Sequence, residues 1–139
     1  MQQLNFSFLE QASTSKIDVL ESELQKVGEA ITKYARHYFY YMVSTAPQKV
    51  GIDSAELWIL IPKIGYDYRV LALHRKTSHH ISVKLYGFGL DPIEEKLVNI
   101  KNDKSDLNKT IDAFLNSEKA NATFRFLIEK VEEDMLEAA

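Results

Sequence analysis

Apolar residues recur at alternating gaps of three and four positions near the start of the chain. This spacing places side chains along one stripe of an α-helix, and the positions between them are mainly charged or polar. We therefore expect an amphipathic helix from about residue 16 to about residue 44. Its buried stripe would consist of Ile17, Leu20, Leu24, Val27, Ile31, Tyr34, Tyr38 and Tyr41.

The last part of this helix has an alternative interpretation. Residues 38–43 are rich in aromatic and β-branched side chains, which favour strands. A helix that ends near Arg36 and is followed by a strand is therefore the alternative. The helix is preferred because its stripe continues in phase through Tyr41. Such a helix would approach about 43 Å, longer than the roughly 30 Å diameter of a small domain.

Four short segments with strand patterns follow, at residues 56–61, 68–75, 81–88 and 97–100. The connections between them are short, which predicts antiparallel pairing of successive strands. In the first strand both faces are apolar, so both need a cover: Leu57, Ile59 and Ile61 point one way, and Trp58 and Leu60 point the other.

Two helical patterns complete the chain. One begins at Ser105, and the second follows a break at Asn116-Ser117. The resulting order predicts an α+β fold with a long N-terminal helix, a four-stranded antiparallel β-meander and two C-terminal helices packed on the sheet.

The 139 residues have no internal repeat or linker, so we expect a single domain over residues 1–139. Residues 1–14 are polar with scattered aromatics and are expected to form a flexible or docking N-terminal arm. The chain has no cysteine, no basic leader pattern and no apolar run long enough to cross a bilayer. These features predict a cytoplasmic protein without a disulfide framework or membrane span.

A basic segment lies in the middle of the chain. Within residues 69–84 there is no acidic residue, and the basic side chains are Arg69, His74, Arg75, Lys76, His79, His80 and Lys84. A hairpin turning at residues 76–78 would place His74 opposite His80, close enough to share a metal. No third ligand is identifiable, so we expect no metal and no cofactor.

The charge balance bears on the partner of this basic hairpin. The net charge of −3 and the isoelectric point near 5.8 argue against nucleic acid as the main ligand, since dedicated nucleic-acid domains usually exceed roughly 9. Residues 91–139 alone carry a net charge of −5. An acidic protein surface, including that of a second copy, is therefore the better expectation.

An aromatic cluster supplies the remaining candidate site. Tyrosine suits both interfaces and ligand pockets because it adds a large surface and a hydroxyl at low conformational cost. The candidate interface or ligand residues are Tyr34, His37, Tyr38, Tyr40, Tyr41 and Trp58.

No phosphate-binding loop, nucleophile motif or metal-protease motif occurs in the chain. We therefore expect a non-catalytic protein-interaction module, a homodimeric accessory protein of a chaperone-like or inhibitor-like kind. One alternative is a small-molecule-binding protein or simple enzyme whose pocket lies between the first helix and the sheet. The other is a weak nucleic-acid binder that uses the basic hairpin 69–84.

Overall fold

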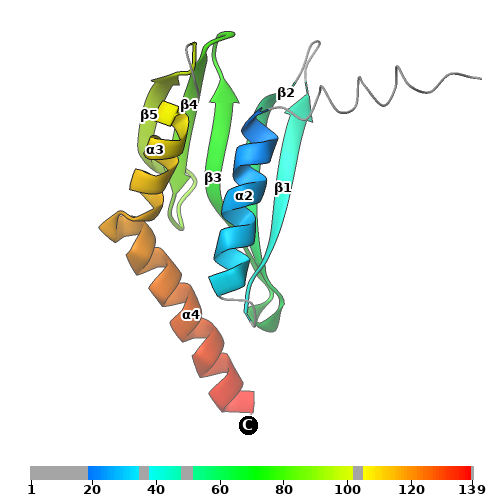
Figure 1. Ribbon diagram of the computed structural model, residues 1–139. Coiled ribbons are helices and arrows are strands. Elements are labelled where there is room, and N and C mark those ends of the chain that lie inside the picture. The colour runs from blue at the N-terminus through cyan, green and yellow to red at the C-terminus, as the bar shows by residue number, and fades with distance from the viewer. Residues whose placement is uncertain (1–18, 35–37, 48–51, 102–104, 139) are drawn as a thin grey trace, which may run out of the picture.

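The computed structural model describes residues 19–34, 38–47, 52–101 and 105–138. One helix, α2 (Val19–Tyr34), precedes five strands. These are β1 (Tyr40–Pro47), β2 (Ile52–Ile61), β3 (Tyr66–Arg75), β4 (His80–Tyr86) and β5 (Pro92–Asn99), with a short 3-10 helix, η1 (Pro62–Ile64), between β2 and β3. Two helices, α3 (Ser105–Leu115) and α4 (Glu118–Ala138), follow the sheet (Figure 1).

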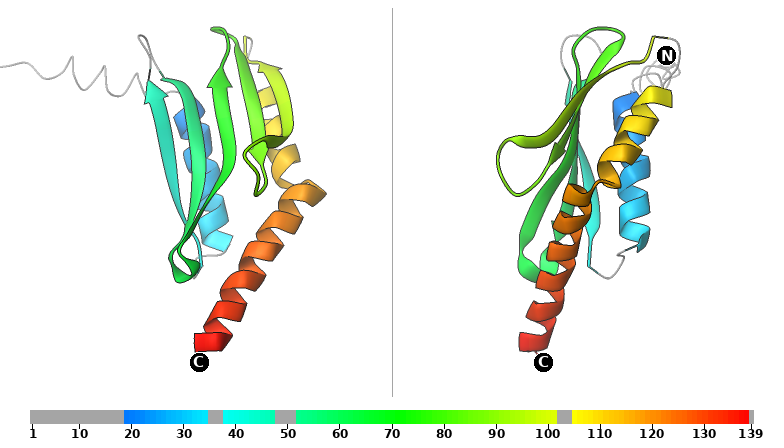
Figure 2. Two further views of the ribbon diagram at one scale, coloured as in Figure 1. Left: turned by 180° about the vertical axis from the view of Figure 1, so that it is seen from behind. Right: turned by 90° about the vertical axis from the view of Figure 1, so that its left-hand side faces the viewer.

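The five strands form one antiparallel sheet in the order β1-β2-β3-β4-β5, so each strand pairs with its sequence neighbours. This confirms the α+β prediction and the meander, and it corrects the strand number from four to five. Helices α2 and α3 lie on the same face of the sheet, and α4 continues beyond α3 to contact η1 (Figure 2). We call the face under α2 and α3 the inner face and the opposite face the outer face.

Side chains on the inner face build the core. Alternate residues of β2 are fully buried there and pack against α2, and Leu20 and Leu24 of α2 and Leu107 of α3 belong to the same core. A bulge interrupts the pairing of β2 with β3, because Leu57 pairs with Leu71 whereas Trp58 pairs with Arg69. The extra residue, Val70, is itself fully buried, so the bulge adds an apolar side chain to the core.

The predicted continuation of the first helix to residue 44 is wrong, and the strand alternative is correct. From residue 39 onward the burial alternates with period two: Phe39, Tyr41 and Val43 pack on the core, whereas Tyr40 and Met42 are exposed. Pairing with β2 explains this outcome, since it buries the aromatic and β-branched residues on a sheet surface that suits them. Because residues 40–47 form the fifth strand, α2 is shorter than the predicted helix, and the predicted excess of helix length does not exist.

The other predicted boundaries need smaller corrections. The break at residues 116–117 does separate α3 from α4. The last strand begins at Pro92, earlier than the predicted residue 97. The difference arises because Glu94, Glu95 and Lys96 are of residue types that are uncommon in strands. The predicted N-terminal arm, residues 1–14, lies outside the described residues.

Candidate functional site

Exposed apolar side chains gather on the outer face of β1 and β2. Tyr40 and Met42 of β1 are 60% and 46% exposed. Their cross-strand partners are Leu60 and Trp58, which are partly buried. Directly opposite residues of paired strands share a face, so all four side chains point the same way. The four side chains form a continuous apolar area, which we call the outer-face patch.

Arg69 of β3 borders the outer-face patch. Its guanidinium carbon lies 3.8 Å from the ring centroid of Tyr86 and 5.8 Å from that of Trp58. Its Nη1 donates a hydrogen bond of 2.8 Å to Oε2 of Glu56. The cation thus stacks on one ring, approaches the second and pairs with a carboxylate, so it covers the middle of the outer face and ends the apolar patch there.

The two edge strands of the sheet differ in chemistry. Strand β1 contains no charged residue, whereas β5 carries Glu94, Glu95 and Lys96. Within the described part of the chain, β1 pairs only with β2, and β5 pairs only with β4. Charges on an edge strand hinder pairing with another chain, and an uncharged edge lacks this protection. Of the two edges, β1 is therefore the one that lacks charged residues to hinder further pairing.

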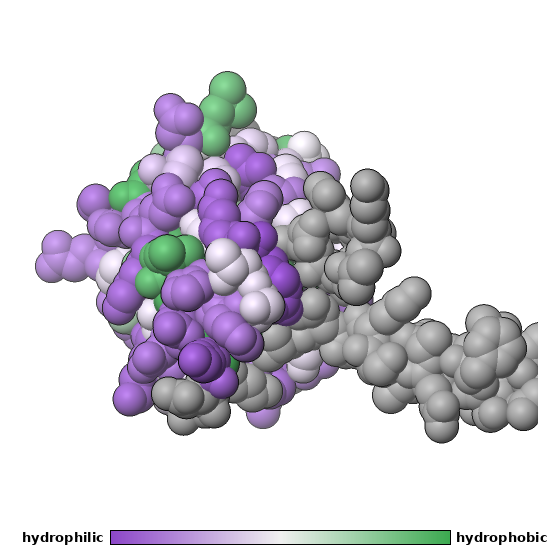
Figure 3. Space-filling view, turned by 90° about the horizontal axis from the view of Figure 1, so that it is seen from above, coloured by the Kyte–Doolittle hydropathy of each residue, from purple (hydrophilic) through white to green (hydrophobic). Residues whose placement is uncertain are grey.

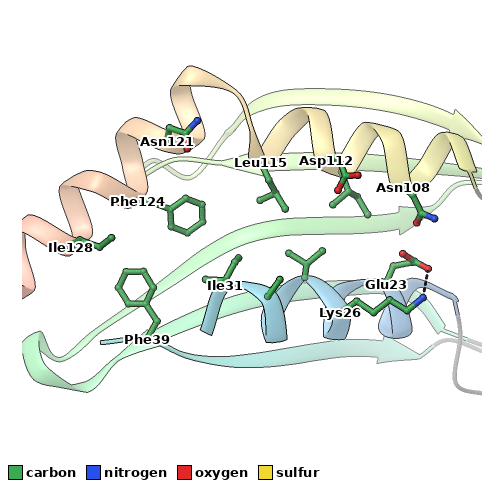
Figure 4. Close-up of a pocket in the computed structure, with 13 residues that line it drawn as sticks. Glu23, Lys26, Ile31, Phe39, Asn108, Asp112, Leu115, Asn121, Phe124 and Ile128 are labelled. Carbon is green, nitrogen blue, oxygen red and sulfur yellow. Dashed lines mark hydrogen bonds and ion pairs between the residues drawn. The ribbon is translucent and has the colours of Figure 1, made fainter. Parts of the chain in front are cut away.

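A groove of about 570 Å³ opens on the other side of the molecule, between α2 and the pair α3–α4. It exists because α2 packs mainly on β1 and β2, while α3 packs mainly on β4 and β5. Figure 4 shows the two walls facing each other across the gap. Its apolar lining consists of Val27, Ala30, Ile31, Phe39, Ile111, Leu115, Phe124 and Ile128.

One end of the groove is polar. Glu23 is 5% exposed and pairs with Lys26, whose Nζ lies 3.4 Å from its Oε1. Asn108 and Asp112 of α3 line the opposite wall (Figure 4). The Oδ1 atom of Asn108 is buried and, among the described residues, accepts no hydrogen bond. Sequence reasoning missed this site, because α2 and α3 are more than 70 residues apart and no local pattern links them.

An aromatic cluster lies where β3, the β4–β5 connection and α4 meet. The ring of Phe88 contacts those of Tyr68 and Phe126 at centroid distances of 5.7 and 5.1 Å. The Tyr68 hydroxyl donates a hydrogen bond to the carbonyl oxygen of Tyr86. Burial raises the pKa of Tyr68 to about 12, so this hydroxyl stays protonated and serves as a structural donor.

The basic hairpin divides into two parts. Arg69 and Lys84 lie on the outer face away from the turn, where Arg69 is ion-paired and Lys84 stands opposite Glu95. The remaining residues, His74, Arg75, Lys76, His79 and His80, lie at the β3–β4 turn, and the end of the molecule that carries this turn is mainly hydrophilic (Figure 3). Binding of nucleic acid by this hairpin stays a prediction.

The predicted cross-strand pairing of His74 with His80 is wrong. His74 pairs with Ser82, because the turn is longer than residues 76–78, and His80 is two positions away from that pairing. Instead, Nδ1 of His80 lies 2.8 Å from Oγ1 of Thr77 within the turn. Over the described ranges no three metal-ligating side chains come together.

The described members of the predicted tyrosine and Trp58 cluster do not meet at one site. Tyr41 faces α2 on the inner side of the sheet, whereas Trp58 and Tyr40 point to the outer side. Tyr38 is partly buried against the core. His37 and the side chain of Tyr34 lie outside the described residues. The structure thus places the described candidates on two faces of the sheet. Successive side chains of a strand point to opposite faces, whereas a helix would have placed residues three or four positions apart on one side.

Comparison with known proteins leaves the chain without a family assignment: no family model, curated protein or solved structure matches it. In the described segments, no helix combines the length and apolar character that a membrane crossing requires.

Proposed function

We propose that this protein is a non-catalytic interaction module that forms a homodimer through the β1 edge and the outer-face patch. The observation that carries the proposal is the coincidence of both features on one strand. An uncharged edge offers backbone hydrogen-bonding groups, and the exposed side chains of Tyr40 and Met42 lie beside them.

A second copy fits this edge better than an unrelated strand would. Antiparallel pairing of β1 with itself about a twofold axis joins the two sheets into one and uses the same patch on both copies. No like charges meet in that arrangement, because residues 40–47 contain none. The two outer-face patches then lie next to each other across the axis, so each copy contributes aromatic and methionine side chains of the kind enriched in interfaces.

Molar mass measured by light scattering on a sizing column tests the proposal. The wild-type protein should elute with twice the chain mass of 16.0 kDa and shift toward a single chain on dilution. Met42→Lys places a charge on the β1 edge and should give the single-chain mass at concentrations where the wild type is dimeric.

Leu97→Lys is the matched control. Leu97 is 57% exposed on the outer face of β5, the opposite edge strand, so the same kind of change there should leave the dimer intact. Circular dichroism establishes that both variants keep the fold. A wild-type protein that stays at 16.0 kDa at all concentrations contradicts the proposal. Equal dissociation by both variants would contradict the assignment to β1.

A further inference from the structure

The groove between α2 and α3–α4 has the properties of a ligand site, and it is separate from the β1 edge of the sheet. Its volume of about 570 Å³ falls within the range of roughly 300–1,000 Å³ that is usual for small-molecule sites. Most of its lining is apolar, and its polar side chains lie mainly at one end, around Glu23 and Asn108 (Figure 4). An occupant should therefore have an apolar body and one polar end.

The hydrogen-bonding side chains at the polar end of the groove indicate which chemical group the polar end of an occupant should carry. Buried polar atoms in folded proteins almost always have a partner. Across the residues that the structure describes, the Oδ1 atom of Asn108 is the buried side-chain atom that lacks one. A carbonyl oxygen can only accept, so the complementary group on an occupant must donate a hydrogen bond.

The charged side chains at the same end of the groove indicate which charge the head group of an occupant should have. Glu23, Lys26 and Asp112 line the groove here, which gives two carboxylates and one ammonium group. The ammonium group of Lys26 is already paired with Glu23. The remaining excess of negative charge disfavours an anionic head group and favours a neutral or cationic one.

We propose that the groove binds a single-chain amphiphile whose head group is a non-anionic hydrogen-bond donor, such as a long-chain amine or alcohol. The head group donates to Oδ1 of Asn108, and the chain lies along α2 toward Ile31, Phe39 and Ile128. From the level of Glu23 to that of Ile31 the helix rises about 12 Å, which a medium-length alkyl chain can span. This site lies on the helix-covered side of the sheet and goes beyond the proposed dimer.

Titration calorimetry with decylamine, decanol and decanoate tests the head-group rule, because the three probes share one tail. Decylamine should bind most tightly and decanoate most weakly. Asn108→Leu removes the acceptor at similar volume and should weaken decylamine binding by about 10- to 100-fold, the value of one hydrogen bond to a charged donor. Asn108→Asp keeps an acceptor oxygen and should bind decylamine at least as tightly as the wild type does.

Asn99→Leu is the control, since it replaces an asparagine by leucine at an exposed position of β5 that does not line the groove. Its affinities should equal those of the wild type. Equal binding of all three probes, or equal effects of the two leucine variants, would overturn the proposal, as would an absence of binding. An affinity that rises in a Phe6→Ser/Phe8→Ser variant would also overturn it, since the chain's own N-terminal residues would then be the occupant.

Discussion

Gly28 provides a sharp test of how α2 packs on the sheet. A Cβ atom at this position would lie 2.4 Å from Cδ2, 2.6 Å from Cγ and 2.9 Å from Cε2 of the Tyr41 ring. All three distances are below the 3.0 Å that real Cβ contacts essentially never cross. Because Cγ is the first ring atom, a rotation that moves only the far end of the side chain cannot relieve the contact. Either the helix or β1 must shift, or the whole Tyr41 ring must leave its position by rotation about the Cα–Cβ bond.

Two opposing effects set the size of the change in Gly28→Ala. Replacing glycine by alanine inside a helix normally stabilises it by about 1 kcal/mol. Overpacking of a well-filled contact typically costs about 1–3 kcal/mol. With three close contacts on a ring, we place the cost at the upper end of that range. The free energy of unfolding should therefore fall by about 1–2 kcal/mol, and the melting temperature by roughly 4–8 °C.

Urea unfolding of four chains isolates the contact: wild type, Gly28→Ala, Tyr41→Ala and the double variant. In the Tyr41→Ala background the ring is gone, so Gly28→Ala should stabilise by about 1 kcal/mol, the helix term alone. Gly89→Ala is the control, since no heavy atom lies within 4 Å of a Cβ there, and its effect should stay within about 0.5 kcal/mol. Stabilisation by Gly28→Ala in the wild-type background would refute the packing argument.

Three further predictions concern polar groups that are buried or partly buried. Since the pKa of Tyr68 is raised from 10.0 to about 12, the unfolded chain loses this proton first, and stability should fall by up to about 2–3 kcal/mol between pH 10 and 12. Urea unfolding across that range should show a smaller fall in Tyr68→Phe. Asn108→Leu should raise the free energy of unfolding of the ligand-free protein by about 1 kcal/mol, because it removes an unsatisfied buried acceptor. A decrease would argue against the unmet hydrogen bond. Arg69→Ala should lower the free energy of unfolding by about 1–2 kcal/mol, because it removes the ion pair with Glu56. It should also red-shift the fluorescence emission of Trp58, because the ring becomes more exposed to water. Unchanged emission would show that Arg69 does not shield the Trp58 ring in solution.

The sequence was sufficient to predict the order of elements because local patterns carry most of it. The alternation of Ile81, Val83 and Leu85 marks a strand, and the break after α3 follows from Asn116-Ser117. The sequence pattern predicts too long a first helix because Tyr38 and Tyr41 fit both a helical stripe and a strand alternation. Pairing of β1 with β2 decides between the two, and that is a contact between segments rather than a local property.

The candidate sites were less predictable for the same reason. Tyr40 and Trp58 were recognised as candidates from residue type, but only the sheet register places them on the outer face together. The groove was not foreseen, because Glu23 and Asn108 each look like an ordinary polar position on its own helix. Their significance depends on the spacing of α2 and α3 over a five-stranded sheet, which tertiary packing alone determines.

The two proposals can fail separately, because their sites lie on opposite faces of the sheet. Met42 is on the outer face, and Asn108 reaches into the groove from α3. Residues that share no partner contribute independently, so Met42→Lys should abolish the dimer and leave decylamine affinity within about two-fold. Asn108→Leu should weaken decylamine binding and leave the dimer mass unchanged. A loss of decylamine binding in Met42→Lys would mean that the groove is complete only in the dimer, and the model of two independent sites would then be wrong.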